Sequence, residues 1–282
     1  MTHYRTIMID GLEIFYRQAG DPERPTLLLL HGFPASSFMY RELITLLEDE
    51  FHVVAPDYPG FGHSAAPTNF SYTFDRLADV IEHFTEAIGI TKYGLYMQDF
   101  GGPVGFRLAH RHPERVTFLV VQNANAYEEG LPDSFWGQAR ELWKDPSDEN
   151  RAKIAEAAMS SEALRWNYIH GVTDPARINP DSWLLQEALL NREGNKEAMV
   201  DLLYDYRTNL ELYPQWQEYF RTNQPPTLVV WGQNDIIFPA EGAHPFAKDL
   251  KQIDFNLLDT GHFALEDHSA EIAAHIKRFN PS

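Results

Sequence analysis

Asp99 is the residue whose position most directly suggests chemistry. The apolar run Leu95–Met97 is typical of a buried strand, and Gly101 and Gly102 allow a sharp turn into a segment with helical spacing. Such a strand–turn–helix is a nucleophile elbow, which exposes one side chain at the end of a sheet and usually carries serine. A carboxylate is already ionised at neutral pH and attacks an sp³ carbon without help from a base. The sequence therefore predicts covalent catalysis through an ester on Asp99.

Asp235 and His262 follow Asp99 in the sequence and are the residue types that hydrolysis of such an ester needs. Each comes after a predicted strand. A histidine can activate water when a carboxylate holds it in the correct tautomer. A lone aspartate at a strand end is more often a helix N-cap, but this order favours the nucleophile. Asn123 ends another strand, where an amide cannot serve as the acid, and His31 is favoured as a structural residue. The remaining competitors are His244, His268, His275, Asp254 and Asp259.

Apolar spacing predicts strands that alternate with helices. Residues 4–18 form a hairpin around Asp10-Gly11, and Thr73 opens an amphipathic helix that Gly89 closes. The other predicted strands span residues 26–30, 51–55, 93–98, 116–121, 226–232 and 255–258. Further helices are expected near Pro239–Leu250 and at Ser269–Phe279. This alternation predicts an α/β fold with a doubly wound, mostly parallel sheet of eight strands.

The alternation is interrupted between residues 127 and 219, where the chain is helical and rich in Trp and Tyr. A helical block inserted after the sixth strand is expected to lie over the carboxyl ends of the strands, where open α/β sheets bind ligands. We therefore divide the chain into a first core part (1–126), a helical cap (127–219) and a second core part (220–282).

Composition limits the classes of partner. The formal charge of −18 argues against nucleic acid and anionic membranes, which attract basic surfaces. The absence of cysteine excludes disulfides, thiol catalysis and zinc–thiolate sites. No segment is long and apolar enough to span a bilayer, and the first residues lack a secretory pattern, so we expect a cytoplasmic protein. The expected partners are a small organic substrate and water, with no cofactor or metal; composition does not indicate an oligomeric state.

The sequence resembles the α/β-hydrolase superfamily over nearly its whole length. The resemblance rests on the HGFP, DYPGFGHS, QDFGG, WGQND and GHF segments. The aspartate in the elbow resembles the branch that contains epoxide hydrolases and haloalkane dehalogenases. This resemblance implies that Asp99 is the nucleophile, Asp235 the acid and His262 the base, and that the backbone N–H groups of Phe33 and Phe100 stabilise the oxyanion.

Epoxide and halide substrates need different protein groups to stabilise the leaving atom. Related dehalogenases place N–H donors, often Trp, beside the nucleophile, whereas Phe33 and Phe100 occupy those positions here. A cap residue such as Trp136 or Trp143 remains a candidate for one donor. Related epoxide hydrolases use cap tyrosines, for which the candidates are Tyr204, Tyr206 and Tyr168, with Tyr213 also available. We therefore expect an epoxide hydrolase-like enzyme, with a haloalkane dehalogenase as the alternative. A weakly catalytic, ligand-binding protein is a third interpretation, which the complete Asp–Asp–His set disfavours.

Overall fold

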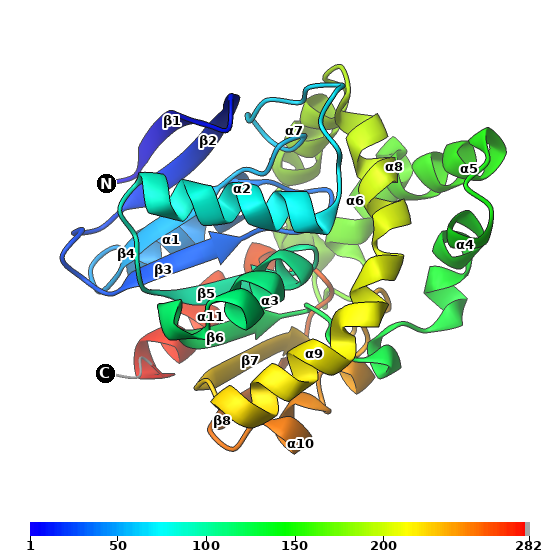
Figure 1. The fold of residues 1–282 in the computed structure, drawn as a ribbon. Helices are drawn as coiled ribbons and strands as arrows, with labels where there is room; N and C mark the ends of the chain where they lie inside the picture. The colour runs from blue at the N-terminus through cyan, green and yellow to red at the C-terminus, as the bar shows by residue number, and fades with distance from the viewer. Residues whose placement is uncertain (280–282) are drawn as a thin grey trace.

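The computed structural model describes residues 1–279, which form a sheet of eight strands (Figure 1). The spatial order is β1-β2-β4-β3-β5-β6-β7-β8. β2 pairs antiparallel with β1 and β4, and the remaining neighbours are parallel. The expected α/β fold is confirmed. The strands are β1 His3–Ile9, β2 Leu12–Ala19, β3 Thr26–Leu30, β4 His52–Pro56, β5 Tyr93–Gln98, β6 Val116–Gln122, β7 Thr227–Gly232 and β8 Ile253–Leu258.

Helices cover both faces of the sheet. In Figure 1, α2 (Phe74–Ala87) and α3 (Gly101–Arg111) lie in front of it, and α11 (Leu265–Phe279) lies behind, in contact with α1 (Arg41–Leu47). β3 shows why both faces are apolar. Its leucines alternate between two buried clusters, with Leu28 and Leu30 in one and Leu27 and Leu29 in the other.

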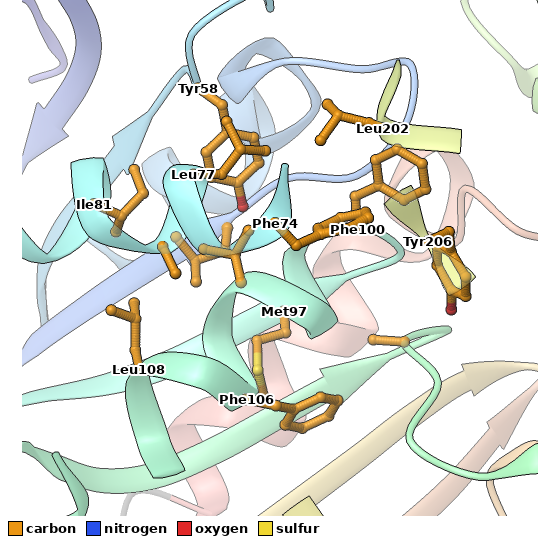
Figure 2. Packing of buried hydrophobic residues seen from close by; sticks show 14 of the residues in the cluster. Tyr58, Phe74, Leu77, Ile81, Met97, Phe100, Phe106, Leu108, Leu202 and Tyr206 are labelled. Carbon is orange, nitrogen blue, oxygen red and sulfur yellow. The ribbon is translucent and has the colours of Figure 1, made fainter. Parts of the chain in front are cut away.

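The amphipathic helix predicted to open at Thr73 is present as α2. The Thr73 side chain accepts a hydrogen bond from the backbone N–H of Arg76, as an N-cap does. Phe74, Leu77 and Ile81 turn inward and pack in a cluster with α3 residues (Figure 2). The short 3₁₀ turns are η1 Ser37–Tyr40, η2 Pro113–Arg115, η3 Glu128–Gly130, η4 Pro175–Arg177 and η5 Ala240–Gly242.

Six helices, here called the cap helices, separate β6 from β7 in the sequence. They are α4 Asp133–Lys144, α5 Asp148–Met159, α6 Ser161–Ile169, α7 Pro180–Leu190, α8 Asn195–Asp205 and α9 Arg207–Asn223. Figure 1 shows α4 to α8 gathered beyond one end of the sheet, whereas α9 returns along α3. Buried Arg107 of α3 donates to the side-chain oxygen of Asn209 at 2.7 Å, so α9 is tied to the core. α9 continues past residue 219, and the division into core and cap stays a prediction.

Two predicted helices differ in their bounds. The segment from Pro239 to Leu250 contains only η5 and the short α10 (Phe246–Asp249), because Pro245 disfavours a helical conformation in the residue before it. The last helix begins at Leu265 rather than Ser269 and is bent at His268, where φ is −121°. Within residues 1–279, no helix has the length and hydropathy of a membrane span.

Candidate active site

Asp99 lies in a strained turn between β5 and α3. Its φ of +51° is unusual for a residue with a side chain. The turn is held because the Asp99 N–H donates to the carbonyl of Asn123 at 3.1 Å and the Asp99 carbonyl accepts from Gly102 at 2.9 Å. A Cβ at Gly101 would overlap the Leu30 carbonyl, which explains why the helix must begin with glycine. The predicted elbow geometry is therefore present.

The Asp99 carboxylate faces two backbone donors. The Phe33 N–H donates to Asp99 Oδ1 at 2.6 Å, and the Phe100 N–H lies close enough to the carboxylate to lower its pKa. Burial raises the pKa of Asp99 to about 6, even though His262 and the two N–H groups oppose this rise. The two donors that the sequence predicted for an oxyanion therefore converge on one carboxylate.

His262 lies between the two aspartates. Its Nδ1 is 2.7 Å from Asp235 Oδ2, and its Nε2 is 3.7 Å from Asp99 Oδ2. Burial lowers the pKa of His262, but Asp235 and Asp99 outweigh burial and raise it above the ordinary value. Because Asp235 accepts from Nδ1–H, the neutral ring presents a lone pair at Nε2, on the side of Asp99.

Asp235 is itself held by two donors. Asn123 Nδ2 donates to Asp235 Oδ2 at 2.8 Å, and the Ile237 N–H donates to Oδ1 at 2.8 Å. The sequence had considered Asn123 only as an unsuitable acid. The structure instead places its amide beside Asp235, where it orients the carboxylate. In the sequence, the position of Asn123 at the end of the neighbouring strand was the only indication of this contact.

A cavity of about 390 Å³ lies between the elbow and the cap helices. Asp99 and His262 line it together with mainly apolar side chains, among them Phe33, Phe100, Trp136, Trp166, Leu203 and Ile237. Among the described lining residues, Glu162 is the only further ionisable side chain. The cavity is therefore suited to a small, mostly apolar molecule.

The cap tyrosines do not line this cavity. Tyr168 stacks on Phe263, with ring centroids 4.2 Å apart, and the Tyr204 ring lies against the Arg207 guanidinium. Figure 2 shows Tyr206 in the same buried cluster as Phe100, and the ring centroids of these two residues are 5.8 Å apart.

The hydroxyl of Tyr206 lies 3.4 Å from that of Tyr213. The tyrosines that the sequence proposed as donors are therefore engaged in aromatic packing or in this hydroxyl contact. The sequence predicted that tyrosines of the cap would donate to the substrate, but the direction of each ring depends on contacts between helices.

The indole N–H groups of the two tryptophans considered as halide donors also have hydrogen-bond acceptors within the protein. The indole N–H of Trp136 donates to the Ile237 carbonyl at 2.8 Å, and that of Trp143 donates to the Leu203 carbonyl at 2.8 Å.

His31 fits its structural interpretation, because it is fully buried and accepts a hydrogen bond from the Tyr58 N–H at 3.4 Å. Burial lowers its pKa to about 4.

Comparison with known proteins identifies the family. The sequence pattern of the alpha/beta hydrolase fold matches residues 25–167. The chain is 44% identical to the uncharacterized hydrolase YNR064C of Saccharomyces cerevisiae, over 95% of this chain and 93% of that protein. It is 31% identical to haloalkane dehalogenase 2 of Mycobacterium tuberculosis, over 89% and 86% of the two chains. Epoxide hydrolase 1 of Caenorhabditis elegans is 24% identical, over 98% and 69%.

A solved structure shares the fold. The haloalkane dehalogenase DbeA of Bradyrhizobium elkani superposes with a TM-score of 0.79, at 22% identity, covering 99% of each chain. This likeness concerns the fold, whereas the family match and the relative with 44% identity concern descent. The chain is therefore a hydrolase that belongs to the alpha/beta hydrolase fold family.

Proposed function

We propose that this hydrolase attacks a small organic substrate with Asp99 and forms an alkyl ester on that residue. The proposal rests on the groups that surround the Asp99 carboxylate. Asp99 opens onto an apolar cavity, while the Phe33 N–H, the Phe100 N–H and His262 surround the same group. An exposed structural aspartate would need none of these neighbours.

The first step forms a bond between a carboxylate oxygen of Asp99 and an sp³ carbon of the substrate, while the bond from that carbon to its leaving atom breaks. No general base is required for this step. In the second step water attacks Cγ of the ester, and Nε2 of His262 takes the proton from the water. The oxyanion that forms is stabilised by the N–H groups of Phe33 and Phe100. When the intermediate collapses, the alcohol leaves with the proton from His262, and Asp99 is restored as a carboxyl group that releases its remaining proton to solvent.

Epoxides are the substrate class that we favour. A departing halide carries a full negative charge and needs N–H donors, but Phe33 and Phe100 have apolar side chains and the Trp136 indole is committed to Ile237. The carboxyl side chain of Glu162 also lines this cavity and supplies no N–H donor to an expelled anion. An epoxide releases ring strain, and its oxygen stays attached to the carbon skeleton, where solvent can protonate it.

A haloalkane is the second candidate. It is supported by the relative with 31% identity, which is a haloalkane dehalogenase, and by Trp166 and Asn167, two cavity-lining residues whose side chains carry N–H groups. A protein that binds ligand without turnover is the third candidate, and it predicts saturable binding with no covalent adduct.

The test is intact-protein mass spectrometry of His262→Gln, in which the ester should persist because the base is missing. An epoxide should add its whole mass, and a haloalkane should add its mass less that of hydrogen halide. Asp99→Asn is the matched control, since asparagine tolerates positive φ but lacks the nucleophile. An adduct that persists in Asp99→Asn, or no adduct with either class, would contradict the proposal.

A further inference from the structure

Gln98 contacts the nitrogen of His262 that must receive the proton from water. Gln98 is the last residue of β5 and is fully buried. Its Nε2 lies 3.0 Å from Nε2 of His262. Because Nδ1 of His262 donates to Asp235, the ring accepts at Nε2 and the amide of Gln98 donates. The lone pair of the base is therefore already occupied in the free enzyme.

The other end of the same amide has no partner. Oε1 of Gln98 is buried without a hydrogen bond from any described residue, and it lies against Gly32, where a Cβ would overlap it. An unsatisfied buried carbonyl costs stability, so a methionine of similar length would suit a purely structural role better. A glutamine at this position is explained by its other end, which contacts His262.

We propose that Gln98 is a positioning residue for the second half-reaction, and this inference rests on the proposed function. In the free enzyme its amide holds His262 in the neutral tautomer with Nε2 directed toward Asp99. In the alkylated enzyme the amide keeps the neutral ring in this orientation until the hydrolytic water takes its place at Nε2. Alkylation does not use His262, so Gln98 acts on hydrolysis alone.

The neighbouring strand offers a matched control. Gln122 ends β6, pairs in register with Gln98, and donates to the backbone carbonyl of His262 at 3.4 Å rather than to the ring. Its own Oε1 accepts from the Tyr96 hydroxyl at 2.5 Å. Both glutamines are fully buried, but only Gln98 contacts the titrating atom.

The experiment measures single-turnover hydrolysis of the preformed ester, against pH, with an epoxide as probe. In the free enzyme the charged groups facing His262 are Asp235 and Asp99; in the ester Asp99 is neutral, and Asp235 is unchanged in the variants. A donor to Nε2 stabilises the neutral ring, so Gln98→Met should raise the pH below which hydrolysis slows, by about 0.7 units for one ordinary hydrogen bond. Gln98→Glu should raise it further, because an adjacent anion stabilises the imidazolium.

Three further readouts separate positioning from a structural role. Alkylation should stay within about twofold of wild type in Gln98→Met, since a twofold change is well under one hydrogen bond. Its melting temperature should not fall, because the unsatisfied carbonyl is removed. Gln122→Met should lower the melting temperature by leaving Tyr96 unpartnered, yet leave the pH dependence unchanged.

An unmoved pH dependence in Gln98→Met, or equal losses in alkylation and hydrolysis, would overturn the inference. Failure of both Gln98 variants to fold would also overturn it, since Gln98 would then be structural. Failure of the proposed function is distinguishable, because His262→Gln would then form no adduct.

Discussion

The pH dependence of alkylation tests the electrostatics of the site most directly. Asp99 is 4% exposed, and burial raises its pKa from 3.8 to about 6. Only the ionised carboxylate is a nucleophile. With a pKa of about 6, about nine tenths of the group is ionised at pH 7 and about one tenth at pH 5. Alkylation should therefore slow about tenfold between these two values, whereas an ordinary aspartate would lose less than about a tenth of its rate.

The assay is rapid mixing of His262→Gln with an epoxide, followed by acid quench and intact-mass measurement of the ester. His262 lowers the pKa of Asp99, so its removal should shift the midpoint upward and enlarge the effect at pH 5. Asp99→Asn corrects for any acid-catalysed addition elsewhere on the chain. A rate that stays flat from pH 7 to pH 5 would refute the reasoning, because the carboxylate would then remain ionised despite its burial.

Three other substitutions have defined outcomes. Asp235→Asn should slow ester hydrolysis by about 10³- to 10⁴-fold, because His262 loses the partner that sets its tautomer, and the ester should accumulate in intact-mass spectra; turnover near the wild-type rate would contradict the assignment. Asp99→Asn should stabilise the fold at pH 7 by up to about 3 kcal/mol, since the carboxyl ionises above pH 3.8 when unfolded but only above about 6 when folded. This gain should vanish in thermal melts as the pH falls below the unfolded pKa of 3.8, and a gain that persisted at about pH 3 would exclude a titration effect. Gly32→Ala should slow alkylation about a hundredfold, because its Cβ would overlap Asp99 and Gln98. An unchanged rate would show that Asp99 can shift without loss of its reactive geometry, which would contradict this reasoning.

Local signals were sufficient for most of the fold. The apolar run before Asp99 and the two glycines after it encode the elbow within ten residues. The capping threonine of α2 and the alternating leucines of β3 act over similarly short distances. The helix predicted near Pro239–Leu250 was wrong in its extent, because Pro245 divides the segment and the local pattern was given too little weight.

The roles of individual cap residues were beyond the reach of the sequence. Tyr168, Tyr204 and Tyr206 have the right chemistry and lie in the right block, but their rings pack outside the cavity. A helix presents each residue to one direction only, and that direction depends on how the cap helices pack on one another.

The sequence by itself determined the sheet, the elbow and the chain order of Asp99, Asp235 and His262, because each depends on residue types within a few positions. The tertiary structure alone decided which hydrogen bonds remain available in the cavity. Trp136 donates to a carbonyl 101 positions away, and Gln98 reaches a ring 164 positions away. Pairings of this kind are set by the packing of strands and helices that meet only in the folded chain, and no local pattern records them.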